Sequence, residues 1–426
     1  MIPTLYRGSV KDLLGPIEIQ GSSALVFEYS DAYSVFDWGR MPDFLSRKGE
    51  ALAVLAADFF EKLEKPEVWR EFSKSSEALV LRKANRFGAI FNELGEELQA
   101  VGLRTHYLGA VLERNSKVNE IHPKKIHEVQ LPFRSVLVRQ VAVVKPSWVS
   151  VMGRSLPDYF QVGKAPAPRL VPLEVVFRFN CSEKSSIYER ASKDPAYLAS
   201  LGFPDAKAEI GAKWDFPVLE LFTKLESTDR PVPLSEALAI SGLSAIQLQE
   251  VLLKTAWVAG LLRFWFLKAD LELADGKLEW AIAEDGKCFL VDAIGPDELR
   301  ILKNGTQLSK EFLRVYYRDT SWYDAVEKAK AYAKAHGISE WKRFVPEPPP
   351  VLPMRHREVA TQVYLALANA LTGRKWFSEA WTLDRVVQEL EDLQQIDRSG
   401  LVPKGSKPAL EGSKLPPEGS KSEDVK

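Results

Sequence analysis

Two carboxylates in one short stretch of the chain have the chemistry of metal ligands. Residues 277–292 read Lys-Leu-Glu-Trp-Ala-Ile-Ala-Glu-Asp-Gly-Lys-Cys-Phe-Leu-Val-Asp. Asp285-Gly286 predicts a two-residue hairpin turn between runs of β-branched and aromatic residues. That turn would place Glu279 directly opposite Asp292. Like charges directly opposite each other destabilise a sheet, so we interpret the pair as ligands for Mg²⁺, completed by water and phosphate.

A lysine is expected on the same face of this hairpin. Lys277 lies two residues before Glu279, and alternate residues of a strand point the same way. The other face would be apolar and buried, with Leu278, Trp280, Ile282, Phe289 and Val291. Two metal-binding carboxylates beside a lysine indicate chemistry on a phosphorylated ligand. The alternative is that Glu279 and Asp292 are solvated residues on an exposed hairpin face, and a three-residue loop would shift the register.

The composition is that of a soluble globular protein. The chain has 426 residues, enough for two or three domains, with 46% hydrophobic and 27% charged residues. Its net charge of −1 argues against general binding to nucleic acid, which requires a basic excess. Local basic sites for small phosphates are still compatible with this charge.

No targeting or membrane segment is expected. The first residues lack the apolar core of a signal peptide, and the most apolar stretch, 251–267, is interrupted by Lys254 and Arg263. The two cysteines, Cys181 and Cys288, cannot form a disulfide framework or a zinc site by themselves. We therefore expect a cytoplasmic protein without membrane association.

Charge, proline content and periodicity predict an α+β chain in four parts. These are an N-terminal α+β lobe at 1–145, a central α+β lobe at 146–345, C-terminal helices at 346–398 and a disordered, low-complexity tail at 399–426. Strands are expected at 25–29, 78–81, 136–144 and 170–179, and helices at 48–63, 244–267, 357–372 and 383–395. The proline-containing segment 145–169 is expected to be a loop or an elaborated connection.

An ordered series of short motifs extends from residue 5 to about residue 375. The motifs are Leu5-Tyr-Arg-Gly-Ser-Val-Lys11, Ser34-Val-Phe-Asp37, Arg47-Lys-Gly49, Val136-Leu-Val-Arg139, Leu170-Val-Pro-Leu-Glu-Val-Val-Phe-Arg178, Thr223-Lys224-Leu-Glu226, Lys277-Leu-Glu279 with Asp292, Pro296-Asp297-x-x-Arg300, Lys310-Glu-Phe-Leu-Arg314, and 348–359 with Tyr364 and Leu371-Thr-Gly373. In this order they resemble the SAICAR synthetase family, the phosphoribosylaminoimidazole-succinocarboxamide synthases of purine biosynthesis.

The resemblance implies a two-lobed α+β fold with antiparallel sheets, an ATP cleft between the lobes, and C-terminal helices. The N-terminal lobe would carry a phosphate loop at Leu5–Lys11, and the central lobe would carry the substrate and metal sites. It also implies a reaction that uses ATP and Mg²⁺. ATP would phosphorylate the carboxylate of carboxyaminoimidazole ribonucleotide, and the amine of L-aspartate would then attack the acyl phosphate. Phosphoryl transfer needs positioned cations more than covalent chemistry, which agrees with the residue types in the motifs.

The same resemblance implies roles for individual residues. ATP would be bound by Lys11, Arg139 and Glu174, and Mg²⁺ by Glu279 and Asp292. Catalytic roles would go to Lys277, Lys224 and Asp297. The substrates would contact Arg178, Arg300, Asp275, Glu226 and Arg314, with Arg178 and Arg300 clamping the 5′-phosphate because a planar guanidinium matches phosphate oxygens.

Several residues depart from the family pattern. Ser9 replaces the first of two lysines, and Ala32 replaces the arginine of an Asp-Arg pair. Thr228 stands where a His-Asp pair is expected, and Ala293 replaces the second acid of an Asp-Glu pair. Glu298 adds a negative charge that the sequence places close to the phosphate site. The nucleotide and metal motifs are therefore better kept than the substrate motifs.

These departures, with an additional stretch at 147–168, leave two alternatives to the family's reaction. The first is a diverged ATP-dependent amide ligase that uses another carboxylate or amine. The second is a nucleotide-binding protein without turnover. Small molecules are the expected partners of both the family's enzyme and the diverged ligase. The sequence allows an oligomer without specifying one.

Overall fold

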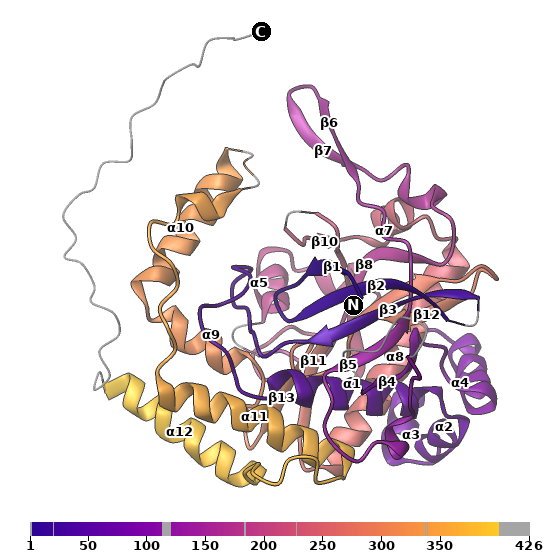
Figure 1. The fold of residues 1–426 in the computed structure, drawn as a ribbon. Helices are drawn as coiled ribbons and strands as arrows, with labels where there is room; N and C mark the ends of the chain where they lie inside the picture. The colour runs from indigo at the N-terminus through magenta and orange to yellow at the C-terminus, as the bar shows by residue number, and fades with distance from the viewer. Residues whose placement is uncertain are drawn as a thin grey trace.

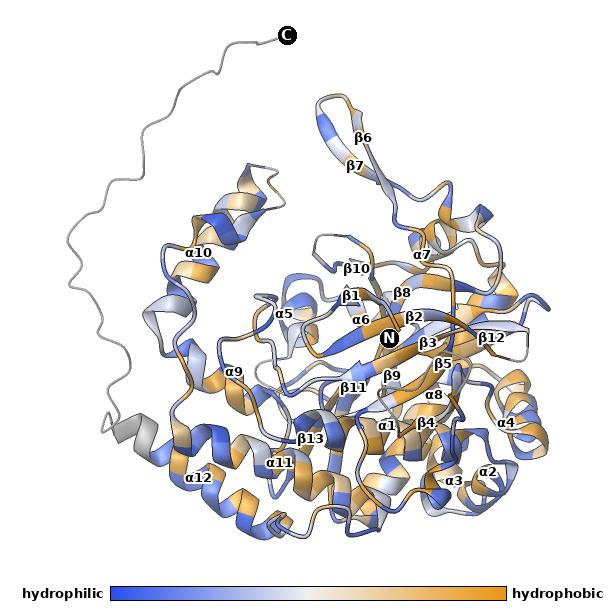
Figure 2. Ribbon diagram, viewed as in Figure 1, coloured by the Kyte–Doolittle hydropathy of each residue, from blue (hydrophilic) through white to orange (hydrophobic). Residues whose placement is uncertain are grey.

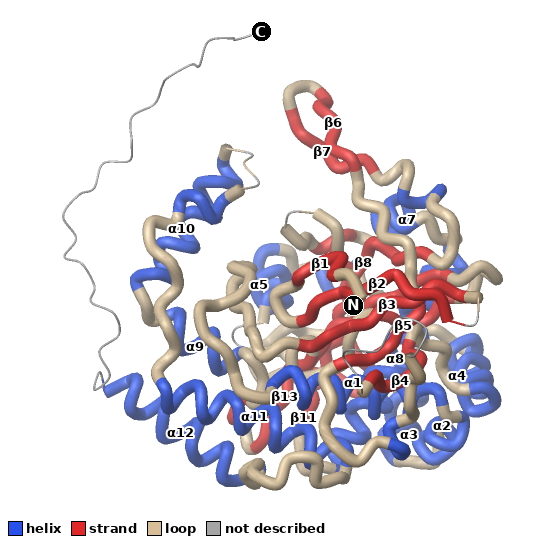
Figure 3. The backbone as a smooth tube through the Cα atoms, viewed as in Figure 1, coloured by secondary structure: helices blue, strands red, loops and turns tan. Residues whose placement is uncertain are grey.

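The computed structural model shows two large antiparallel sheets with helices packed around them, and a separate two-stranded hairpin (Figure 1). It describes residues 2–399 except 20, 113–120, 183–184, 227, 337 and 339. The first sheet has five strands, in the order β1 (Thr4–Arg7), β2 (Lys11–Ile19), β3 (Ser22–Tyr29), β5 (Ser135–Arg139) and β4 (Tyr107–Val111). Figure 3 shows the strands gathered in the middle of the molecule, with helices around them.

Four helices follow the third strand. They are α1 (Lys48–Glu64), α2 (Pro66–Phe72), α3 (Ser76–Lys83) and α4 (Ala89–Val101). Helix α1 is buried along most of its length and packs on β3, β4 and β5. The strand expected at 78–81 is wrong, because these residues lie in α3. The hydroxyl of Ser75 caps that helix by accepting from Ala78 N at 3.1 Å, and only Ala78 and Leu81, three residues apart, are buried.

The second sheet holds the central part of the chain. Its order is β10 (Pro231–Val232), β9 (Lys213–Thr223), β8 (Arg169–Asn180), β11 (Glu272–Ile282), β13 (Leu299–Lys303) and β14 (Thr306–Gln307), with β12 (Cys288–Val291) paired to β11. Helices α5 (Ser186–Lys193), α6 (Tyr197–Ser200), α7 (Leu234–Ser241) and α8 (Ala245–Lys268) surround it. A capping box of Ser244 and Gln247 begins α8, which packs across the sheet and is largely hydrophobic in Figure 2.

The β11–β12 hairpin differs by one residue from the predicted register. Glu279 pairs with Val291, and Ala283 N donates to Lys287 O at 2.9 Å, which leaves a three-residue loop instead of a two-residue turn. The predicted apolar face is correct for Leu278, Trp280 and Ile282, which lie in the main core, and wrong for the two residues of β12. Phe289 and Val291 lie on the Glu279 side of the hairpin, in a small cluster separate from the main core. A slip of one residue exchanges the two faces of a strand.

The additional stretch forms a hairpin of its own. Strands β6 (Ser147–Val151) and β7 (Arg154–Asp158) pair only with each other and project away from the rest of the molecule (Figure 1). At the base of this hairpin, the 3₁₀ turn Val162–Lys164 packs on α7. Strand β5 ends at Arg139, earlier than the predicted end at residue 144.

The C-terminal part is helical. Helices α9 (Glu311–Arg318), α10 (Ser321–Ala335), α11 (Met354–Thr372) and α12 (Leu383–Ser399) follow the second sheet, and α11 packs between α1 and α12. The disordered tail expected from residue 399 lies outside the described residues after that first position. Across the described parts of the chain, none of the helices has both the length and the hydropathy to span a bilayer.

Candidate active site

Lysines and carboxylates form a connected group where β11 pairs with β8. The ladder places Glu279 beside Glu174. Lys224 Nζ contacts Glu279 Oε1 at 2.6 Å and Glu174 Oε1 at 2.7 Å, and Lys277 Nζ donates to the same Glu174 oxygen at 2.7 Å. Both glutamates are buried. Burial opposes ionisation of Glu174, but the two lysines outweigh it and lower the pKa of this carboxyl.

Asp292 connects this group to the first sheet. Lys11 Nζ, at the start of β2, donates to Asp292 Oδ1 at 2.5 Å. Asp292 follows the last residue of β12 and has a positive φ of 72°, so the backbone leaves the strand direction at this residue. Burial alone would raise the pKa of Asp292, but Lys11 and Lys224 hold it well below its usual range. The contact joins residues 281 positions apart, one from each sheet.

The pKa of Glu279 shifts in the direction opposite to that of Asp292. Its burial and the charge of Asp292 raise its pKa to about 7, although Lys224 opposes the shift. The two predicted metal ligands are thus close enough to act on each other, even though the predicted register is wrong. An ionised Glu279 lacks full compensation from the lysines, so an additional cation at this position would relieve the repulsion.

A second buried ion pair lies beside the group. Lys48 Nζ in the first turn of α1 contacts Asp297 Oδ2 at 2.8 Å, and Tyr364 Oη donates to Asp297 Oδ1 at 2.7 Å. Burial opposes ionisation of Asp297, but Lys48 and Lys310 hold its pKa well below the usual range. A Cβ at Gly49 would lie 2.5 Å from the carbonyl oxygen of the β3 residue Tyr29, so only glycine allows α1 to begin this close to the sheet.

The charge at Glu298 belongs to the same region. Burial and the neighbouring Asp297 raise the pKa of Glu298 to about 7, while Lys310 and Lys11 act in the opposite direction. Sequence reasoning expected this carboxylate near the phosphate site at Arg300. The charged groups that affect the pKa of Glu298 most are instead Asp297, Lys310 and Lys11.

An arginine cluster lies further along the same strands. Asp275 is paired in register with Arg178 on one side and Arg300 on the other, and its Oδ2 contacts Arg178 Nη1 at 3.0 Å and Arg300 Nη1 at 2.9 Å. Glu220 on β9 contacts Arg178 Nε at 2.5 Å and also pairs with Arg190 of α5. Three guanidinium groups therefore share two carboxylates, and the cluster keeps a positive charge.

Serine hydroxyls complete this cluster. Arg178 Nη2 donates to Ser186 Oγ at 3.2 Å, and Arg300 Nη1 donates to Ser182 Oγ at 3.4 Å. Glu279 lies four positions after Asp275 on β11, and four steps correspond to about 13 Å at about 3.3 Å per residue. A mononucleotide can bridge that separation, with its phosphate at the arginines and its base at the lysines.

Three residues expected at the site lie elsewhere or have other partners. Arg139 is exposed at the end of β5, and its backbone N–H donates to His106 O at 2.7 Å. Arg314 on α9 pairs with Glu311 at 3.1 Å, and among the described residues no hydrogen bond or ion pair joins it to the arginine cluster. The Glu226 side chain, only 6% exposed, pairs with a neighbouring arginine instead of pointing at the central group.

The loop after Lys224 contributes an acid, Asp229, to which the sequence analysis gave no role. Asp229 is exposed in this loop, yet partial loss of solvent around its carboxyl and the charge of Glu174 raise its pKa to about 6, while Lys224 and Lys277 oppose the change. This carboxyl therefore lies near the central group. The loop is held by Arg230, whose Nε contacts Glu226 Oε2 at 3.0 Å. The sequence signal was Asp229 itself, which directly follows Thr228, the residue that stands where the His-Asp pair is expected.

Comparisons of the sequence with known proteins agree on one family. A family model described as SAICAR synthetase matches residues 161–329. A protein of Archaeoglobus fulgidus, provisionally named a phosphoribosylaminoimidazole-succinocarboxamide synthase, is 34% identical over 390 residues, covering 91% of this chain and 99% of its own. A synthase of the same name from Thermoplasma acidophilum is 32% identical over 219 residues, covering 49% of this chain and 69% of its own.

Solved structures agree on the fold. A SAICAR synthase superposes with a TM-score of 0.53 at 18% identity, covering 88% of this chain and 96% of its own. The Saccharomyces cerevisiae SAICAR synthase, solved with SAICAR, gives a TM-score of 0.50 at 18% identity over the same shares. The predicted α+β fold with two antiparallel sheets is confirmed. By its identity over nearly the full length of a relative, the chain belongs to the SAICAR synthetase family.

Proposed function

We propose that this protein is an ATP- and Mg²⁺-dependent ligase that joins the carboxylate of carboxyaminoimidazole ribonucleotide to the amine of L-aspartate. The product would be the succinocarboxamide nucleotide SAICAR. The observation that carries the proposal is the connected group of Lys11, Lys224 and Lys277 with Glu174, Glu279 and Asp292, placed along the same strands as an arginine cluster. As an enzyme of purine biosynthesis it is expected in the cytoplasm, acting on small molecules.

The donor set fits a magnesium ion. Glu279 and Asp292 offer hard oxygen ligands, and the repulsion between these two carboxylates is what a bound divalent cation would relieve. Among the residues that the structure describes, no group of three potential ligands is arranged for a metal. Mg²⁺ commonly takes one or two carboxylates and completes its shell with phosphate and water, so two ligands suffice. When bound, it would neutralise charge on the phosphate oxygens.

The lysines are positioned for phosphoryl transfer. An oxygen of the ribonucleotide carboxylate would attack the terminal phosphorus of ATP, and the bond to ADP would break as the acyl phosphate forms. Lys11, Lys224 and Lys277 would neutralise the charge that spreads over the phosphoryl oxygens. Glu174 bonds both Lys224 and Lys277, so it keeps these two ammonium groups in place and charged.

Amide formation completes the reaction. The aspartate amine would attack the acyl carbon, inorganic phosphate would leave, and the amine would lose a proton. Asp229 is the carboxylate that we assign to accept this proton, because its pKa is raised to about 6 and it lies beside Lys224 and Lys277. An acid whose pKa lies near the working pH is suited to this exchange.

The arginine cluster would hold the 5′-phosphate of the ribonucleotide. Arg178 already contacts two carboxylates, Asp275 and Glu220, whereas Arg300 contacts Asp275 alone. Arg300 therefore has more donors free for the phosphate, and Arg178 sets the geometry of the cluster. In this proposal Asp275 orients both guanidinium planes and does not touch the phosphate, because two negative charges would repel.

The proposal is tested by ADP release from the purified protein with ATP and Mg²⁺, omitting each of the other two substrates in turn. Release that depends on both, with SAICAR detected by mass spectrometry, is the expected result. Lys277→Met should abolish it. Lys268→Met, at an exposed lysine that pairs with Glu71, is the matched control and should retain it. ADP release that ignores both substrates would contradict the proposed ligase.

A further inference from the structure

The additional stretch at 147–168 is anchored at its base, although its hairpin projects away from the rest of the molecule (Figure 1). A Cβ at Gly242, which follows α7 with a positive φ of 65°, would lie 2.4 Å from the Cα of Gly163, so the two backbones meet directly. Arg169, which follows the stretch, donates from Nη1 to Ser241 O at 3.1 Å and from Nη2 to Gly242 O at 2.7 Å. These contacts fix the base of the additional stretch on α7.

One side chain of this base reaches the loop that carries Asp229. Tyr159 directly follows β7 and is 7% exposed. Its Oη donates to Glu226 Oε1 at 2.9 Å. Burial and the hydrogen bond to Glu226 raise the pKa of this phenol, so it stays protonated and keeps donating. The contact therefore ties the additional stretch to a loop beside the proposed reaction centre.

Glu226 is held from a second direction as well. Arg230 closes the β9–β10 hairpin, where Thr223 N donates to Arg230 O at 3.0 Å. The guanidinium of Arg230 donates to Glu226 Oε2 at 3.0 Å and Oε1 at 3.1 Å, and to Glu236 Oε1 of α7 at 2.6 Å. Both oxygens of Glu226 are thus engaged by protein donors. This residue therefore anchors the loop, and Asp229 lies between two fixed positions.

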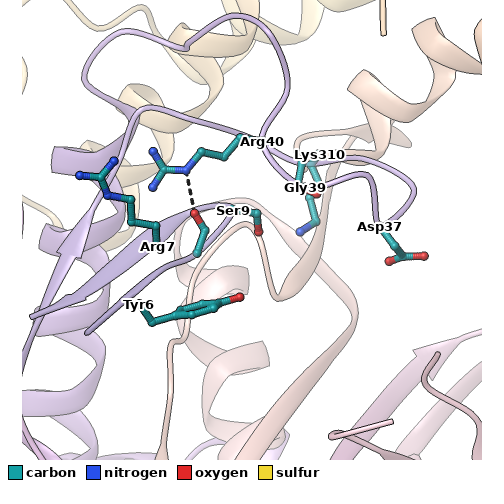
Figure 4. A pocket seen from close by; sticks show the side chains of 9 residues that line it. Tyr6, Arg7, Ser9, Asp37, Gly39, Arg40 and Lys310 are labelled. Carbon is teal, nitrogen blue, oxygen red and sulfur yellow. Dashed lines mark hydrogen bonds between the residues drawn. The ribbon is translucent and has the colours of Figure 1, made fainter. Parts of the chain in front are cut away.

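The position of Asp229 depends on these anchors. Among the described residues, no hydrogen bond or ion pair holds its carboxylate. Glu174 at the centre acts on its charge, and so does Asp37, which lines the open hollow beside the β1–β2 turn (Figure 4). The carboxylate therefore lies near both, and the backbone of the loop decides its distance from each.

We propose that Tyr159 is a positioning residue, which acts through Glu226 on the loop that presents Asp229 to the aspartate amine. This inference rests on the proposed ligase function. The step concerned is amide formation, in which the amine attacks the acyl carbon, phosphate leaves and Asp229 accepts the proton. Formation of the acyl phosphate should not depend on Tyr159, because the central lysines keep their own contacts with Glu174.

Tyr159→Phe tests the proposal, because it removes one oxygen and leaves Glu226 paired with Arg230. In initial-rate assays, kcat for SAICAR formation should fall about tenfold, as expected for the loss of a hydrogen bond to a charged group, with the three KM values within about twofold. Hydroxylamine captures an acyl phosphate without a protein base. With hydroxylamine replacing L-aspartate, ADP release should therefore stay within about twofold. Tyr332→Phe, at an exposed tyrosine of α10, is the matched control and should change neither rate.

A second background separates positioning from a general structural role. In Asp229→Asn, which already lacks the proton acceptor, adding Tyr159→Phe should lower kcat by less than about twofold. A tenfold fall in both backgrounds, an equal fall with hydroxylamine, or an unchanged kcat would each overturn the proposal. Absence of turnover in the unaltered protein would instead reject the ligase function. Hydrogen exchange measured by mass spectrometry then decides whether Tyr159 positions the loop: faster exchange at 223–230 in Tyr159→Phe supports this, and unchanged exchange rejects it.

Discussion

Replacing Glu279 by glutamine should stabilise the unliganded protein at alkaline pH and weaken its response to magnesium. Glu279 is buried beside Asp292, and its pKa is raised to about 7. The folded protein therefore opposes ionisation of this carboxyl. Glutamine has nearly the same shape and no charge, so it removes the repulsion, while Lys224 keeps its contact with Glu174.

The size and sign of the change in stability on Glu279→Gln follow from the raised pKa of Glu279. The pKa rises from 4.5 to about 7, and one pKa unit corresponds to about 1.4 kcal/mol, so ionised Glu279 costs the unliganded fold about 3 kcal/mol. An acid with a raised pKa in the folded state contributes stability below its unfolded pKa and loses it as the pH rises. The stability advantage of Glu279→Gln should thus be near zero at pH 4.5 and should grow until the pH passes about 7.

The assay is a set of thermal melts of both proteins between pH 5 and pH 8.5, with and without Mg²⁺. The difference in Tm between variant and unaltered protein isolates Glu279, because all other titrating groups are shared. It should increase by several degrees across this range. Mg²⁺ should raise the Tm of the unaltered protein more at pH 8 than at pH 6, and that of the variant much less. A difference that is flat with pH, or a variant less stable at pH 8, would refute the reasoning.

Three further predictions concern the other charged groups. Arg300→Lys should raise the KM for the ribonucleotide about tenfold or more and leave that for ATP within about twofold in initial-rate assays, because the fork geometry is lost. Asparagine tolerates the positive φ at position 292, so Asp292→Asn should keep the backbone conformation. It should lose Mg²⁺-dependent ADP release. It should also melt at a lower temperature at pH 7, because a carboxyl whose pKa is lowered in the folded state stabilises the protein there and stops doing so only as the pH falls below the usual pKa of an aspartate. Lys48→Met should destabilise the protein by about 3–5 kcal/mol in denaturant titrations, because Asp297 loses its buried counter-ion, and adding Asp297→Asn should recover part of that loss.

Long elements with strong local signals were predictable from the sequence. Helix α1 was expected at 48–63 and α8 at 244–267, and both are confirmed within one residue at each end. The strand expected at 170–179 is confirmed as β8. The segment 78–81 was misassigned because four apolar residues carry no clear period, and the capping serine that precedes them decides the outcome.

The candidate site was predictable where its residues are close along a strand or paired in a hairpin. Lys277, Glu279 and Asp275 all come from β11, and the structure places them as the alternation of a strand requires. The pairing of Lys48 with Asp297 joins residues 249 positions apart, and it arises from the packing of α1 on the second lobe. Local patterns contain no information about such a contact.

The error in the hairpin register is informative about how the proposed metal site is built. In an extended ladder, a shift of one residue would send the two carboxylates to opposite faces. Asp292 escapes this rule because β12 ends before it, its positive φ turns the backbone, and Lys11 of the other sheet holds its carboxylate. The pair therefore depends on the contact between the first sheet and the segment that follows β12. With Mg²⁺ and ATP bound, Lys11 would pair with a phosphate and Asp292 with the metal in place of each other, and this exchange would couple nucleotide binding to assembly of the site.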